Sequence, residues 1–203
     1  MFVRTVYATG DPAKIDTALR ALNSEGRDLL EERPGYRGSD VLTDRELGKL
    51  FVVSWWDSEQ ARRNSDEVMR ERRADLLEPF AATLAVENYE AAVCHTIRMP
   101  RAAGGLRLTR LEFDPVDTDL LVDAYRAGAL PRIEMLPGLA RTSLFTDRER
   151  GRGTVSALFT DRESMTAART ALADVRCEAA AKTHATVTAL EEFDIVHADV
   201  RPD

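Results

Sequence analysis

The feature that most constrains the fold of this chain is a turn-like segment that occurs twice in its sequence. Residues Leu42–Lys49 read LTDRELGK and residues Phe145–Arg152 read FTDRERGR, at an offset of 103 residues. Other dipeptides coincide at the same offset: Asp11-Pro12 with Asp114-Pro115, and Pro34-Gly35 with Pro137-Gly138. A period of this length exceeds that of solenoid repeats and indicates a duplicated domain.

The offset predicts two domains of similar length in a chain of 203 residues. We place the first repeat at residues 1–96 and the second at residues 106–203. The segment between them, residues 97–105, ends in Gly104-Gly105 and is interpreted as a linker.

Each half has the pattern of a β-α-β-β-α-β unit. In the first half, residues 2–9 (FVRTVYAT) are rich in Val, Thr and aromatic residues, as strands are. Asp11 followed by Pro12 is typical of a helix start, because Asp caps free N–H groups and Pro has none to lose. Residues 49–56 (KLFVVSWW) are a nearly continuous apolar run of strand length.

Short signals mark the other junctions. Gly48 and Gly151 are expected to supply the positive φ of a hairpin turn. Capping boxes predict the start of the second helix in each half: Asp57 with Gln60, and Thr160 with Glu163. The last strand is predicted over residues 182–196, which places His184 within a strand.

The β-α-β-β-α-β order is that of the ferredoxin-like unit, which carries both helices on one face of an antiparallel sheet. The other sheet face must be covered, because it is otherwise a large exposed apolar patch. Residues 49–56 are apolar on both faces, as in buried strands. We therefore predict an α+β fold of two tandem ferredoxin-like repeats, packed sheet-to-sheet as a pseudo-dimeric α/β barrel.

Composition excludes several classes of function. A net charge of −7 argues against a general surface for nucleic acid or for anionic membranes. No apolar run approaches the ~20 residues of a membrane span, and the first residues do not have the pattern of a signal peptide. With only two Cys and three scattered His, we expect a cytoplasmic protein with no metal site.

Two motifs resemble a known family. Pro34-Gly35-Tyr36 and the strand-to-helix junction Trp56–Ala61 (WDSEQA) are similar to the PG[FY] turn and the WxSxxA junction of the antibiotic biosynthesis monooxygenase-like family. That family belongs to the dimeric α/β-barrel superfamily, in which two chains usually build the barrel. The resemblance implies that this chain holds both halves itself, as a monomer or a weak homodimer.

The resemblance also implies a chemistry. Members oxidise aromatic polyketide intermediates with O₂ and no metal or flavin, and other members degrade haem. For this chain it implies a small aromatic ligand, no cofactor, and Trp56, Tyr36 and Arg37 as candidate catalytic residues. Haem-degrading relatives carry a Trp and a His on the second helix, and residues 62–73 contain neither, so haem degradation is disfavoured.

Four further residues are candidates for lining a ligand pocket: Tyr7, Trp55, Asn64 and His95. Trp55 and Trp56 alternate along a strand, so one of them faces the barrel interior, and the sequence does not say which. The competing interpretation is that Trp56 is a core residue and that Asn64 and His95 are exposed.

Two functional hypotheses remain. The first is a cofactor-independent monooxygenase that acts on a small aromatic or polyketide-type substrate in a pocket of the first half. The alternative is a non-catalytic ligand-binding or accessory protein that retains the barrel without the oxygenase chemistry. The absence of Asn from residues 2–9 and 49–56 favours the alternative, and the retained Trp, Tyr and Arg favour the first.

Overall fold

The structure is a computed structural model that describes residues 1–100, 102 and 104–200. Arg101 and Ala103 of the predicted linker, and residues 201–203, lie outside the described residues. The chain forms two compact units: unit 1 is Met1–Asn88 with Val196–Asp203, and unit 2 is Tyr89–Ile195. This division follows contacts in space, so the repeat boundaries inferred from the sequence stay a prediction.

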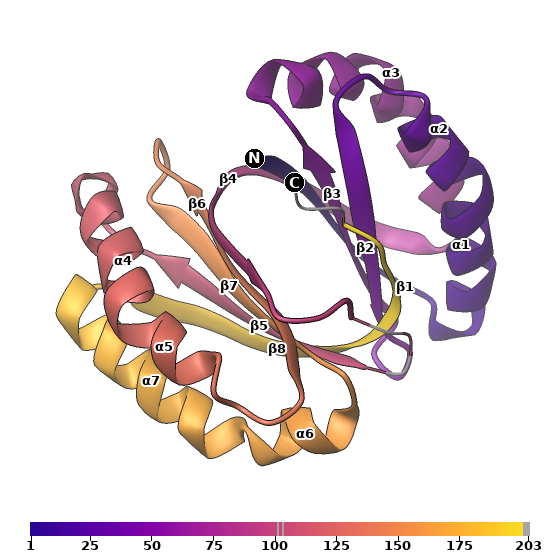
Figure 1. The fold of residues 1–203 in the computed structure, drawn as a ribbon. Helices are drawn as coiled ribbons and strands as arrows, with labels where there is room; N and C mark the ends of the chain where they lie inside the picture. The colour runs from indigo at the N-terminus through magenta and orange to yellow at the C-terminus, as the bar shows by residue number, and fades with distance from the viewer. Residues whose placement is uncertain (101, 103, 201–203) are drawn as a thin grey trace. The chain divides into compact units, whose positions relative to one another are not determined.

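Unit 1 contains the first β-α-β-β-α-β series (Figure 1). Its elements are β1 (Phe2–Gly10), η1 (Pro12–Lys14), α1 (Ile15–Ala21), the π-helical η2 (Leu22–Gly26), α2 (Arg27–Glu31), β2 (Tyr36–Asp44), β3 (Lys49–Trp56), α3 (Glu59–Leu77) and the start of β4 (Ala81–Thr96). Strand β4 begins in unit 1 and ends in unit 2.

Unit 2 repeats the same order. Its elements are β5 (Gly105–Glu112), η3 (Pro115–Asp117), α4 (Thr118–Ala124), the π-helical η4 (Tyr125–Ala129), α5 (Leu130–Ile133), β6 (Leu139–Asp147), β7 (Arg152–Phe159), α6 (Arg162–Ala167), α7 (Arg169–Thr183) and most of β8 (Thr186–Ala198). The final residues of β8 belong to unit 1. The two π-helical segments stand at equivalent positions, 103 residues apart.

The apolar strand is central in each unit. Strand β3 pairs antiparallel with β1 and β2, and β7 pairs antiparallel with β5 and β6. In unit 2, β5 also pairs with β8, and β6 pairs with the end of β4. The strand order, β1-β3-β2-β8-β5-β7-β6-β4, is that of a closed barrel. The predicted fold class, an α+β barrel built from two ferredoxin-like series, is confirmed.

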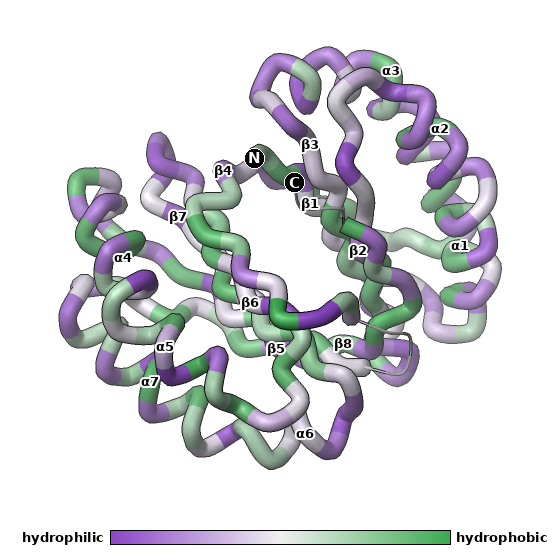
Figure 2. Tube along the Cα trace, viewed as in Figure 1, coloured by the Kyte–Doolittle hydropathy of each residue, from purple (hydrophilic) through white to green (hydrophobic). Residues whose placement is uncertain are grey.

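Helices cover one face of each sheet (Figure 1). In unit 1 the core between them includes Ile15 and Leu19 of α1, Leu50 and Val52 of β3, and Leu77 of α3. Hydrophilic and hydrophobic residues alternate along the helices, as expected for helices with one face on a sheet (Figure 2). Within the described residues, every helix is too short or too polar to span a bilayer.

The two glycine turns are as predicted. Gly48 has φ +61° and Gly151 has φ +60°, and each carbonyl accepts a hydrogen bond from a neighbouring strand end, Gly10 N at 2.9 Å and Phe113 N at 2.8 Å. A Cβ at Gly151 would lie 2.0 Å from the carbonyl oxygen of Phe113. Glycine is therefore required here both by its backbone conformation and by the close approach of another strand.

The predicted N-cap of the second helix was wrong by one residue in each half. The side chains that cap the second helices are Ser58 and Asp161, one residue after Asp57 and Thr160. The reason is that the N–H groups of Asp57 and Thr160 still bond to Gly35 and Gly138, which keeps both residues at the strand end.

The predicted start of the last strand was also wrong. Helix α7 runs to Thr183, and His184 is its C-cap in the left-handed conformation, with φ 54°. His184 is therefore a helix-terminating residue and not a strand residue. A left-handed C-cap is usually glycine or asparagine, so the sequence carried no common signal for it.

We expect Gly151→Ala to lower the free energy of unfolding by about 1–3 kcal/mol, because Ala at this φ is strained and its Cβ meets a backbone oxygen. Gly128→Ala is the control, since a Cβ added at Gly128 would meet no other atom within 4 Å and Ala favours helices. Urea unfolding of both variants tests this, and an equal loss of stability in the two would contradict it.

Candidate functional site

The two tryptophans of β3 lie on opposite faces of the unit 1 sheet. Trp56 is on the helix side: its Nε1 donates to Ser54 Oγ at 3.1 Å, and its ring lies 5.7 Å from the Arg4 guanidinium. Trp55 points away from the helices, and its Nε1 donates to Asp40 Oδ2 at 3.1 Å. Both are fully buried. The question left open by the sequence is thus answered: Trp55 is the one that faces away from the helices.

Arg4 joins the sheet to helix α3. Its guanidinium donates to Ser65 Oγ at 2.9 Å and to the carbonyl of Arg62, and its Nε lies 3.4 Å from Asp66 Oδ1. The side chain is 2% exposed. Burial lowers the pKa of Arg4 to about 10, against the opposite effect of the Asp66 charge, so the guanidinium is still protonated at neutral pH.

Asp66 is shared by several guanidinium groups. Arg73 donates to its Oδ1 at 3.3 Å, and Arg70 donates to its Oδ2 at 3.4 Å. Burial alone would raise the pKa of Asp66, but the positive charges of Arg4 and Arg73 outweigh burial, and the pKa is lowered. One carboxylate therefore partly balances three guanidinium charges.

A cavity of about 60 Å³ lies beside this cluster, between the sheet and the helices of unit 1. We call it the unit 1 cavity. Its polar lining comes from Arg4, Arg27, Arg73, Ser39, Ser54, Asn23 and His197. Its apolar lining comes from Val6, Leu22, Leu30, Val41, Val52, Met69, Leu76 and Leu77. The π-helical η2 contributes Leu22, Asn23 and Gly26 to this lining.

His197 enters the unit 1 cavity from the end of β8. Its Nε2 lies 2.9 Å from Asp199 Oδ2, close enough for an ion pair, although the geometry is not that of a hydrogen bond. Asp199 also accepts a hydrogen bond from Ser39 N at 2.9 Å through Oδ1. The C-terminal segment of unit 1 thus supplies an imidazole with an adjacent carboxylate.

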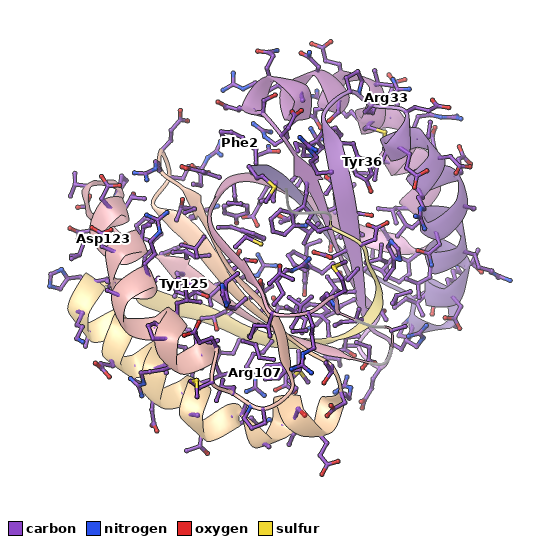
Figure 3. All side chains as sticks on the ribbon, in the orientation of Figure 1. Phe2, Arg33, Tyr36, Arg107, Asp123 and Tyr125 are labelled. Atoms are coloured by element: carbon purple, nitrogen blue, oxygen red, sulfur yellow. The ribbon has the colours of Figure 1, made fainter. Side chains whose placement is uncertain are left out.

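Unit 2 has a cavity of about 60 Å³ in the matching place, lined mostly by apolar side chains. We call it the unit 2 cavity. Arg107 and Arg176 line it, and they stand 103 residues after Arg4 and Arg73. Tyr125, whose pKa is raised by burial, shares a hydrogen bond of 2.6 Å with Thr142. Arg107 and Tyr125 are labelled in Figure 3.

Of the predicted catalytic residues, Trp56 and Tyr36 lie together. Their ring centroids are 5.6 Å apart, edge to face. Burial raises the pKa of Tyr36 to about 12, so its hydroxyl is protonated at neutral pH. Tyr36 is labelled on β2 in Figure 3. Arg37 follows it and lines a separate, open surface pocket with Tyr36 and Asp199.

The predicted pocket residues are not gathered at one place. Tyr7 contacts Phe51, at 6.4 Å between ring centroids, and Asn64 accepts from Gln60 on the exposed side of α3. His95 lies in unit 2, where its Nε2 is 3.5 Å from Glu134 Oε2. None of Tyr7, Trp55, Asn64 and His95 lines the unit 1 cavity. Their role as ligand-binding residues stays a prediction.

Sequence reasoning missed Arg4, Ser54, Arg73 and His197. A signal for two of them was present, since Arg4 and Arg107, and also Arg73 and Arg176, recur at the 103-residue offset. Arg73 lies in a run of charged residues, 70–75, of the kind that usually forms the exposed face of a helix. The side chains of Arg70 and Arg72 are exposed, but the Arg73 side chain is 11% exposed. In the described chain, no three His, Cys, Asp or Glu residues are grouped to hold a metal ion.

The geometry defines a class: a ferredoxin-like α+β protein with a cavity between sheet and helices in each unit. Residues 1–70 match the family model described as Antibiotic biosynthesis monooxygenase. The family resemblance inferred from the sequence is confirmed over residues 1–70, the part of the chain that matches the model of that family.

Relatives in Mycobacterium tuberculosis extend the likeness along the chain. The uncharacterized protein Rv2557 is 28% identical over 165 residues, which are 81% of this chain and 74% of the relative. The uncharacterized protein Rv2558 is 25% identical over 202 residues, which are 99% of this chain and 86% of the relative.

Solved structures share the fold. An anthrone oxidase-like protein aligns with a TM-score of 0.72 at 14% identity, over 98% of this chain and 92% of that chain. The haem-degrading enzyme LmHde from Listeria monocytogenes aligns with a TM-score of 0.57 at 8% identity, over 96% and 99% of the two chains. At these identities the likeness shows the fold alone.

We expect Asp66→Asn to lower the free energy of unfolding at pH 7 by about 1–3 kcal/mol, because the carboxylate that pairs with Arg4 and Arg73 is lost. The folded-state pKa of Asp66 lies below its ordinary value of 3.8. The stabilisation is therefore fully present above pH 3.8 and is lost as the pH falls through the folded pKa.

Urea unfolding at pH 7, 5 and 3 measures this difference. The gap between wild type and Asp66→Asn should be equal at pH 7 and 5 and smaller at pH 3. Asp75→Asn, on the exposed side of the same helix, is the control and should change stability little. A gap that is the same at all three pH values would show that the charge of Asp66 is not what matters.

Proposed function

We propose that this chain binds a small aromatic molecule in the unit 1 cavity. The observation that supports this is the pairing of an apolar lining with a buried guanidinium and a hydroxyl, Arg4 and Ser54, both held by Trp56. Ligand sites in proteins commonly combine a mostly apolar wall with a few fixed polar groups. Trp56 does not line the cavity, so its role in this proposal is to position Arg4 and Ser54.

The reaction we propose is oxidation by O₂ without a metal or flavin, as the family resemblance implies. A substrate of the anthrone type loses a proton from its methylene carbon, and the carbanion passes electrons to O₂. The carbon gains one oxygen atom as a carbonyl and loses two hydrogens, and the second oxygen atom leaves as water. Arg4 and Arg73 would stabilise the oxyanion that develops on the substrate.

His197 is the proposed base. Imidazole is a common general base in proteins, and the Nε2 atom of His197 lies 2.9 Å from Asp199 Oδ2. Among the described residues, no Asp or Glu side chain lines the unit 1 cavity. The proposed reaction therefore uses His197 as the base and the guanidinium groups of Arg4 and Arg73 to stabilise the oxyanion.

A second candidate is a non-catalytic ligand-binding or accessory protein. Its support is that none of the three residues predicted as catalytic, Trp56, Tyr36 and Arg37, lines the unit 1 cavity. The cavity, at about 60 Å³, has room for a few water molecules and is smaller than typical ligand clefts. A ring fits only if the helix layer moves. The π-helical η2 forms part of that layer, and π-helical segments are often found at functional sites.

Thermal unfolding in the presence of dithranol (an anthrone), 1-naphthol, flavin mononucleotide and haemin tests binding. A ligand at ~100 times its Kd stabilises the folded state by roughly 2.7 kcal/mol, which shifts Tm by several degrees. We expect a shift with dithranol or 1-naphthol, and oxygen uptake with dithranol. A shift without oxygen uptake would support the second candidate.

A matched pair of variants locates the site. Val52 and Val155 line the two cavities at equivalent positions, so Val52→Phe fills the unit 1 cavity and Val155→Phe fills the unit 2 cavity. We expect Val52→Phe to abolish the shift and Val155→Phe to retain it, with circular dichroism confirming that both fold. No shift in the wild-type protein, or its loss in Val155→Phe alone, would overturn the proposal.

A further inference from the structure

The charged side chains that line the unit 1 cavity are all positive or can become so. Arg4, Arg27 and Arg73 line it, and no carboxylate of the described residues does. Arg27 is neutralised outside the lining by Glu31 and Asp199, at 2.7 and 3.2 Å. Arg4 and Arg73 share a single carboxylate, Asp66, which Arg70 also contacts. An excess of positive charge therefore remains at the Arg4–Arg73 end of the cavity.

The buried guanidinium of Arg4 is only partly satisfied. Its two terminal nitrogens donate to Ser65 and Arg62, but Nε has no hydrogen-bond partner, although Asp66 lies at ion-pair distance. The Nε atom of Arg73 also has no hydrogen-bond partner. A buried donor without a partner is costly, and a charged donor more so. A ligand acceptor that reaches either Nε would reduce that cost.

Unit 2 provides an internal comparison. There Arg107, the counterpart of Arg4, donates through both Nε and a terminal nitrogen to Glu192. Its Nε is satisfied, and Glu192 is shared with one further guanidinium, that of Arg169. The position of Asp66 is taken in unit 2 by Arg169, and that of Trp56 by Phe159. The two units thus have arginines at the same positions, but Arg4 pairs with Asp66 in unit 1 and Arg107 pairs with Glu192 in unit 2.

We propose that the unit 1 cavity selects organic anions: an apolar ring that carries a carboxylate or a phenolate, with the oxygen atoms bound by Arg4 and Arg73. This rests on the proposed binding function and adds the charge of the ligand to it. Hydrogen bonds between guanidinium and an oxyanion are stronger than those between neutral groups, and two arginines on one side favour a planar carboxylate.

Calorimetric titration with benzoate and benzamide tests the proposal at pH 7. The two probes have the same ring and nearly the same shape, and only benzoate is charged. We expect wild type to bind benzoate at least about tenfold more tightly than benzamide. Equal affinity for the two would overturn the anion proposal and leave the binding function standing. No binding of either would count against both proposals.

Arg73 is the residue to change, because Arg4 ties β1 to α3 and its loss threatens folding. We expect Arg73→Gln to bring the affinity ratio of benzoate to benzamide near one, and Arg73→Lys to retain most of it by keeping the charge. Arg176→Gln, at the equivalent position of unit 2, is the control and should leave the ratio unchanged. A ratio unaffected by Arg73→Gln, or lowered by Arg176→Gln alone, would contradict the assignment.

Discussion

The contact on which unit 1 depends is the buried guanidinium of Arg4. The Arg4 side chain extends from β1, passes beside the ring of Trp56 and bonds to the backbone and a side chain of helix α3. A charge in such a place is stable only when several partners surround it. The strand, the helix and the cavity wall therefore meet at one side chain, and the anionic ligand that we propose would bind to the same charge.

Much of the fold could be predicted from local rules. The repeated turn, the apolar strand and the Asp-Pro helix start each reflect a physical preference of a few residues, and all three are found where expected. The errors in the helix caps arose where tertiary contacts overrode the local signal. Ser58 caps the helix because the neighbouring Asp57 is held at the strand end by Gly35.

The candidate site was harder to predict. Trp56 was chosen because it matches the junction motif of the family, yet it does not line the unit 1 cavity and instead contacts two residues that do, Arg4 and Ser54. The lining residues Arg4 and Arg73 are ordinary charges in a chain rich in arginine. They recur at the 103-residue offset, but their burial, which sets them apart from the exposed arginines, depends on how the strand and helix meet. His197 lies far from the rest of the site in sequence, so no local pattern links them.

That separation has a consequence for how the protein is made. The hydrogen bond between Ser39 and Asp199 joins residues 160 positions apart, and Asp199 also lies next to His197, which lines the cavity. During synthesis, the chain of unit 2 must emerge before the segment that completes unit 1 exists. The first unit to be translated is then the last to be finished, and its cavity gains an intact wall only after the rest of the chain has had time to fold.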